Sequence, residues 1–201
     1  MFFLAQATSA DIPKYLDRLI QIPGWQPWKK RFDWLESHSK LGPTMPRHLR
    51  DQFPLEMAFL DIRRHHTKTG RYRVDLDDEF HHRLASFAAM TAMCHQRFGA
   101  AGKSNLRGRI VDALKNDNGL GPVAFEMRMI SQLFHRGFEV AFSDFENLER
   151  FDFLAEREGQ AIEVECKYFT SDIGRSIRRR EFNSLANKIT EWMSKAIEES
   201  V

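Results

Sequence analysis

Hydrophobic and polar positions follow one period along the first part of the chain and another along the rest. Up to about residue 120 the apolar residues recur three or four positions apart, which predicts a mostly helical region. Its helices are expected near 12–20, 28–35, 55–64, 77–97 and 106–114, with breaks at Pro23-Gly24, Gly42-Pro43, Thr67–Gly70 and Gly99–Gly102.

Beyond residue 121 the pattern predicts a helix, a strand, a hairpin and a second helix, in that order. An apolar stripe at Val123, Met127 and Ile130 predicts the first helix, which Pro122 suits as a starting residue. The strand is expected at 138–142, and the last helix at 182–197, where apolar residues return with a near-ideal helical period.

The hairpin is predicted from two short runs, 151–156 and 161–167, in which apolar and polar residues alternate. A polar link that contains a glycine joins them. In the second run Glu163, Glu165 and Lys167 share one face, because successive side chains of a strand point to opposite sides. Residues two apart lie roughly 6.6 Å from each other. A carboxylate and an ammonium group at that spacing can flank one phosphate.

An acidic residue in one strand and Glu-x-Lys in the next, here Asp152, Glu165 and Lys167, resemble the signature of the PD-(D/E)XK nuclease superfamily. Restriction endonucleases, junction resolvases and repair exonucleases belong to it. The resemblance covers roughly residues 122–201, and Phe151 stands where the family name implies a proline.

The resemblance implies an α+β fold in which an all-helical N-terminal region, residues 1–120, precedes a restriction-endonuclease-like core, residues 121–201. That core consists of a helix, a three-stranded or larger mixed sheet, and a helix. The family usually adds a further strand, whereas this sequence stops at Val201. Truncation of the core at its C-terminus therefore stays open.

By the same resemblance, the expected activity is metal-dependent hydrolysis of phosphodiester bonds in nucleic acid, with DNA favoured over RNA. Asp152 and Glu165, together with the Cys166 carbonyl, would hold Mg²⁺ or Mn²⁺. Lys167 would position or help activate the attacking water and stabilise the developing negative charge. Glu126, in the first helix of the core, would complete the metal shell directly or through water.

Each candidate carboxylate also has a purely structural interpretation that involves neither catalysis nor metal binding. Glu126 lies on the apolar stripe of its helix, where a carboxylate is costly unless it is paired or bound to metal, but a glutamate near a helix N-terminus also gains from the helix dipole. Asp152 would suit the polar face of a half-exposed strand. Glu163 is either an accessory ligand or, as we prefer, a solvated strand position.

Charge is unevenly spread around the hairpin. Residues 139–165 contain nine acidic side chains and only Arg150 and Arg157 as basic ones, a crowding that favours a bound cation, although part of it belongs to surface loop. A basic cluster then follows Lys167. It suits contact with a phosphodiester backbone, and its alternative is a solvated charge run. Its members are Arg175, Arg178, Arg179 and Arg180.

Composition excludes little. The chain has 201 residues, of which 42% are hydrophobic and 29% charged, as in ordinary globular proteins, and its net charge of +2 decides nothing. Cys94 and Cys166 match no disulfide or zinc spacing, so a reducing, cytoplasmic setting is the default. No signal peptide or membrane anchor is evident, and a homo-oligomer stays open.

Two other groups of residues favour ordinary structure over chemistry. Bases interleave with aromatics between Trp25 and Trp34, but the helical spacing of Trp28 and Phe32 favours core packing over nucleobase stacking. Paired histidines at 65–66 and 81–82 would point apart on a helix and do not suggest zinc. Two alternatives to the enzyme remain: a catalytically inactive nuclease-fold module that binds nucleic acid, and a protein-interaction module.

Overall fold

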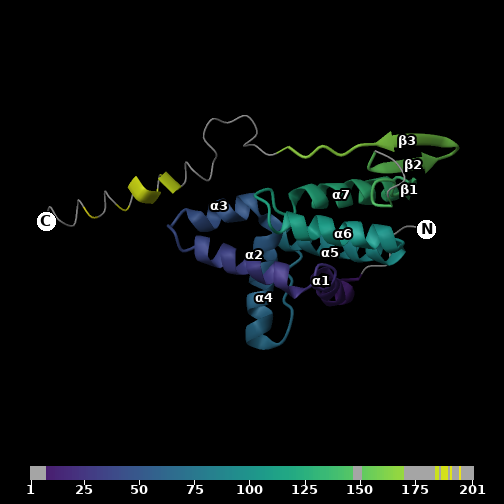
Figure 1. Cartoon of the computed structure of the whole chain (residues 1–201). Coiled ribbons are helices and arrows are strands. Elements are labelled where there is room, and N and C mark those ends of the chain that lie inside the picture. Colours follow the sequence, from purple (N-terminus) through teal and green to yellow (C-terminus); the bar gives the residue numbers. More distant parts are fainter. Residues whose placement is uncertain are drawn as a thin grey trace.

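The structure is a computed structural model that describes residues 8–146, 151–169, 184, 185, 187–189, 191 and 195. Over these residues the chain is α+β and mostly helical, with a three-stranded antiparallel sheet (Figure 1). A short 3-10 turn, Ser9–Asp11, precedes seven helices and three strands: α1 (Ile12–Gln21), α2 (Trp25–His38), α3 (Met45–Gln52), α4 (Pro54–Thr69), α5 (Glu79–Arg97), α6 (Ala100–Ala113), α7 (Gly121–His135), β1 (Glu139–Ala141), β2 (Phe153–Arg157) and β3 (Gln160–Val164).

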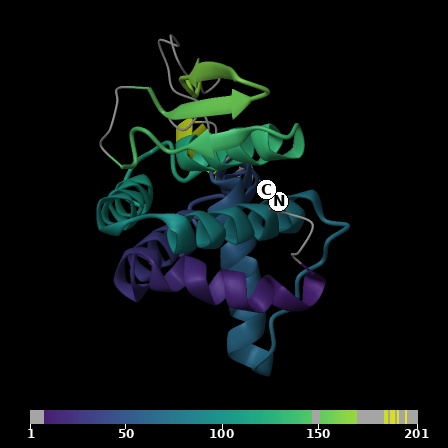
Figure 2. The same cartoon turned by 90° about the vertical axis from the view of Figure 1, so that its right-hand side faces the viewer.

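The sheet lies along one side of the helical body, next to α7 (Figures 1 and 2). Helix α7 in turn packs against α5 and α6, and α5 packs against α1 and α4. The C-terminal end of α4 projects from the body at the end remote from the sheet, as both views show. The molecule therefore has a sheet edge and a protruding helix end on opposite sides of a helical core.

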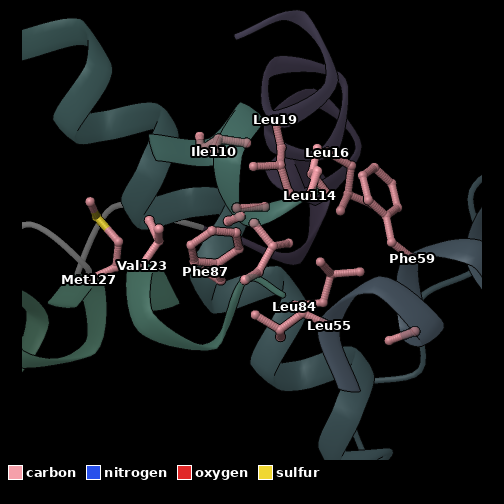
Figure 3. Packing of buried hydrophobic residues seen from close by; sticks show 14 of the residues in the cluster. Leu16, Leu19, Leu55, Phe59, Leu84, Phe87, Ile110, Leu114, Val123 and Met127 are labelled. Atoms are coloured by element: carbon pink, nitrogen blue, oxygen red, sulfur yellow. The ribbon is translucent and has the colours of Figure 1, made fainter. Parts of the chain in front are cut away.

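A continuous buried cluster runs from the first helix to the sheet. Leu16 and Leu19 of α1 face α5 across the core, while Val123 and Met127 of α7 extend the same cluster (Figure 3). Phe153 of β2 is fully buried and belongs to it. The predicted N-terminal region and the predicted core region thus share one hydrophobic interior.

The predicted aromatic packing in α2 is confirmed. Trp28 is fully buried, its ring packs edge-on against Phe59 of α4, and its indole N–H donates to the Leu19 carbonyl at 3.2 Å. Phe32, one turn further along, is buried beside it. This part of the aromatic and basic cluster is therefore core and not a free stacking surface.

The helices differ from the prediction at two boundaries and by one additional helix. The expected turn at 67–70 is helical as far as Thr69, and the expected break at 99–102 ends at Gly99, so that α6 already contains Gly102. Helix α3 was not predicted at all. None of the described helices combines the length and apolar character that crossing a bilayer requires.

Three consecutive strands form the sheet as predicted, but their bounds differ from the prediction. Asp152, Glu165 and Lys167 were expected inside the hairpin strands and lie just outside β2 and β3. The hairpin turn is also shorter than expected. The pairing of Arg157 with Gln160 leaves a two-residue turn, in which Glu158 (φ 53°) and Gly159 (φ 78°) both adopt positive φ. Such a turn matches the right-handed twist of its strands. Both described pairings are antiparallel, so the expected mixed sheet is not observed in this part of the chain.

Candidate functional site

Glu126 is held on α7 by an arginine from the neighbouring helix. Its side chain is 15% exposed, and Arg109 of α6 donates to its Oε2 at 2.7 Å. Burial raises the pKa of Glu126, Arg109 opposes that shift, and the negative charge of Asp152 adds to it. The ion pair with Arg109 therefore offsets the cost of burying the Glu126 carboxylate.

Arg109 forms the centre of a larger polar contact. Its second terminal nitrogen pairs with Asp144 in the loop after β1, and its guanidinium lies 4.2 Å from the centroid of the Phe145 ring. Asn105, one turn earlier on α6, donates to the Phe145 carbonyl at 2.8 Å. Helix α6 therefore fixes both Glu126 and the loop that leads toward β2.

Asp152 lies in a bend immediately before β2, and its carboxylate joins the two strands of the hairpin. Its Oδ2 accepts a hydrogen bond from the Cys166 backbone N–H at 2.5 Å. The last described pair of the ladder is Phe153 with Val164. Asp152 and Glu165 each lie one residue beyond this pair, outside the paired strands.

Glu165 and Lys167 follow β3 and form an exposed ion pair with each other. The pKa of Lys167 is raised, first by the hydrogen bond to Glu165 and then by the charges of Glu165 and Asp152. The ammonium group therefore stays protonated at neutral pH. Because both side chains are mostly exposed, the pair adds little to stability.

Cys166, between them, is half-buried and faces two carboxylates. Burial, followed by the charges of Asp152 and Glu126, raises the pKa of its thiol to about 11. A thiol with that pKa is protonated at neutral pH and is a poor nucleophile. Only the backbone carbonyl of Cys166 remains as a group that could bind a cation.

Asp152 connects the predicted site residues. Its charge acts on Glu126, Cys166 and Lys167, which come from α7 and from the segment after β3. Glu165 joins this group through its ion pair with Lys167. Among the described residues, no group of three or more His, Cys, Asp or Glu side chains could hold a metal ion. A cation here would have to rest on fewer side chains than that.

Two parts of the predicted site cannot be compared with the structure. Arg175, Arg178, Arg179 and Arg180 lie outside the described residues, as does most of the expected final helix. The described positions of that helix are helical, and Asn187 is buried where it accepts a hydrogen bond from Thr44 at 2.6 Å.

Sequence reasoning missed Arg109 and Asp144. The available signal was the position of Arg109, three residues after Leu106 and one before Ile110, both of which are buried. A charged residue at the edge of an apolar stripe often has a partner on the helix or loop it packs against.

No protein-family model, curated protein or solved structure matches the chain.

Replacing Arg109 tests whether this contact stabilises the site. Arg109→Ala should lower the free energy of unfolding by about 1.5–3 kcal/mol, the usual value for hydrogen bonds to charged groups. It should also raise the pKa of Glu126 further, because the opposing positive charge is lost. Urea denaturation and a carboxyl NMR titration measure the two effects.

Arg107→Ala is the matched control, since Arg107 lies on the exposed face of α6 and should change stability by less than about 0.5 kcal/mol. Equal stability losses in the two variants would mean that the Arg109 contacts contribute nothing specific.

Proposed function

We propose that the chain hydrolyses phosphodiester bonds in nucleic acid, with DNA favoured as substrate, in a metal-dependent reaction on a restriction-endonuclease-like core. The observation that carries the proposal is the position of Asp152. It lies within electrostatic reach of a helix carboxylate and of the Glu-x-Lys segment that the sequence resemblance pairs with it. The order of α7 and the three strands agrees with that core.

The donor chemistry fits a hard divalent cation. Mg²⁺ prefers oxygen ligands and is commonly held by one or two carboxylates together with waters and substrate phosphates. Asp152, Glu165 and the Cys166 carbonyl would supply protein oxygens for it. Burial raises the pKa of Glu126, Arg109 opposes that rise, and the charge of Asp152 adds to it. A cation beside these carboxylates would offset their negative charge.

A bound Mg²⁺ or Mn²⁺ lowers the pKa of its water and neutralises charge on the scissile phosphate. Lys167 is the chain's own positive charge beside that phosphate. Because its pKa is raised, it cannot remove a proton from water at neutral pH. Its role is to orient the water and to stabilise negative charge in the transition state.

Glu126 and the basic cluster have supporting roles in this proposal. Arg109 holds Glu126 in place, from where its carboxylate would complete the metal shell through water. The arginines at 175 and 178–180 would contact phosphates and bind substrate without regard to sequence. Neither role requires a base-specific contact.

A second candidate is a nucleic-acid-binding or protein-interaction module without catalysis. The observation in its favour is that the charges are already paired: Glu165 with Lys167, and Glu126 with Arg109. In such a module Lys167 and Arg109 neutralise the carboxylates and no cation is needed. The two candidates differ in whether cleavage occurs.

Cleavage of supercoiled plasmid in Mg²⁺ or Mn²⁺ tests the proposal, with Glu165→Gln as the variant. Glu165→Gln should lose about 10²–10³-fold in rate, the usual effect of removing one electrostatic group from an active site. Glu163→Gln is the matched control, because Glu163 lies two residues away on the same face and should cut at the wild-type rate.

Two results would contradict the proposal. One is wild-type protein that binds DNA and does not cut it in either metal, which would favour the non-catalytic module. The other is equal cutting by the Glu165→Gln and Glu163→Gln variants.

A further inference from the structure

The strongest concentration of positive charge in the described chain lies far from the hairpin. Residues 63–73, which we call the basic arm, contain five Lys or Arg and two His side chains and no carboxylate. The arm consists of the last turns of α4 and the segment after it. It projects from the helical body at the end remote from the sheet (Figures 1 and 2).

Part of this charge has a structural role. Arg63 lies over the Trp25 ring at 5.3 Å, and Arg64 pairs with Glu36 of α2 at 3.1 Å. The remaining three cations, Lys68, Arg71 and Arg73, are exposed, and none of them forms an ion pair with another described residue.

Helix-end electrostatics explain only one of these three. Lys68 is in the last turn of α4, where a cation is favoured by the carbonyl end of the helix dipole. Arg71 and Arg73 come after the helix has ended at Gly70, which adopts φ 70°. The helix dipole therefore does not account for their positive charge.

The arm is ordered by its own contacts. The Gly70 N–H donates to the His66 carbonyl at 2.7 Å, and Tyr72 stacks on the His66 ring at 4.3 Å. The Tyr72 hydroxyl donates to Asp17 of α1 at 2.5 Å, which fixes the segment after Gly70 to the body. Because the arm is already ordered, binding a ligand here costs less conformational entropy.

We propose that the basic arm binds the phosphodiester backbone of nucleic acid, as a second contact separate from the hairpin site. Three cations without an ion pair among the described residues, on an ordered protrusion, suit a row of phosphates, which attract Lys and Arg without reading bases. Because the second contact is to the substrate of the proposed reaction, the inference rests on the proposed function.

An anionic membrane surface fits the arm less well. Binding to an interface usually combines basic residues with exposed apolar ones that enter the lipid. In the arm the one aromatic side chain, Tyr72, is half-buried and already engaged by His66 and Asp17. The residues that flank Lys68 in the sequence are threonine and glycine, and the exposed Trp25 ring beside the arm is engaged by Arg63.

The test compares two triple variants of the full chain with equal charge loss. Lys68→Ala, Arg71→Ala and Arg73→Ala remove the arm cations. Binding to a random-sequence duplex of about 40 base pairs is measured in EDTA from about 50 to 200 mM salt. The loss of three phosphate contacts should lower the slope of log Kd against log salt concentration by about 2.7. Between about 50 and 200 mM salt, the Kd of the variant should therefore rise by a factor about 40 times smaller than that of wild type.

The matched control carries the substitutions Lys40→Ala, Arg47→Ala and Arg107→Ala. These residues are also one lysine and two arginines, exposed and without an ion pair to another described residue. The control should keep most of the wild-type slope. Equal slope changes in both variants would overturn the proposal, because net charge alone would then explain binding.

Cleavage kinetics separate this inference from the proposed function. The arm variant should raise KM and leave the rate at saturating DNA unchanged, since no arm residue lies at the hairpin. If the arm variant lowers the salt slope of DNA binding but wild-type protein never cuts DNA, the arm contact is supported and the proposed nuclease activity is refuted. An unchanged salt slope in the arm variant would refute the proposal that the arm binds nucleic acid. Arm-dependent binding to vesicles of anionic lipid, without binding to the duplex, would refute it as well.

Discussion

Lys167→Ala should lose about 10²–10⁴-fold in the rate of DNA cleavage, the usual contribution of one acid–base or electrostatic group. It should keep or slightly strengthen Mg²⁺ binding, because a positive charge beside the site repels the cation. Asp152→Ala should instead lose both cleavage and metal affinity. Calorimetric titration with Mg²⁺ beside a cleavage assay distinguishes the two roles.

Because Lys167 is exposed, its substitution should change cleavage without changing the fold. Its ammonium group contacts Glu165 and is otherwise in solvent, so the substitution should not unfold the protein. Lys103→Ala, on the exposed face of α6, is the matched control and should cut at the wild-type rate. Wild-type cutting by Lys167→Ala would remove Lys167 from the mechanism. Absence of divalent-metal binding by wild-type protein, even with DNA present, would remove Asp152 and Glu165 as ligands.

The proximity of Asp152 to the segment after β3 could be predicted from the sequence because it is local. A hairpin brings its two strands together through one short turn, so alternation along 151–167 is enough to bring the end of one strand beside the other. The stabilising partners of the site depend on distant packing. Arg109 reaches Glu126 only because α6 lies beside α7, and no local pattern specifies that arrangement.

The helix boundaries were wrong at two places where local signals suggested a turn or a break. Thr67 and Thr69 suggested a turn, but α4 continues to Thr69 and accommodates both hydroxyls, which donate to carbonyls four residues earlier. Gly102 suggested a break, but it lies inside α6 where a Cβ would come within 2.9 Å of Phe98. Its lack of a side chain permits close packing.

Helix α3 was missed for a different reason. It has eight residues, most of them polar, and only Met45, His48 and Leu49 are buried. Three buried positions are too few for a periodic signal, so the helix depends on the core it covers and not on its own propensity.

The buried carboxylate of Glu56 joins α4 to the start of α7, and its loss should have a large effect on stability. It is 1% exposed, and its Oε1 accepts a hydrogen bond from the Leu120 N–H at 2.8 Å. Arg31 is its buried electrostatic partner. Gly119, at φ 55°, lies so close that an added Cβ would meet the Glu56 carboxylate.

Glu56→Ala should lower the free energy of unfolding by about 3–5 kcal/mol, because it removes the main negative charge that acts on the buried Arg31 and leaves the Leu120 N–H without its acceptor. Glu56→Gln should cost much less, since the amide oxygen can still accept from Leu120. Asp51→Ala, an exposed carboxylate on α3, is the control and should change stability by less than about 0.5 kcal/mol. Urea denaturation gives all three values.

The pH dependence provides an independent test of the same group. Burial raises the pKa of Glu56 above its unfolded value, so the folded state binds the proton more tightly. The contribution of Glu56 is therefore most favourable below the ordinary pKa of a glutamate, and it declines as pH rises through the folded-state pKa. Glu56→Gln removes this contribution. The stability of wild type minus that of the Gln variant should fall with increasing pH, and a difference that rises or stays constant would mean that Glu56 is ionised in the fold without penalty.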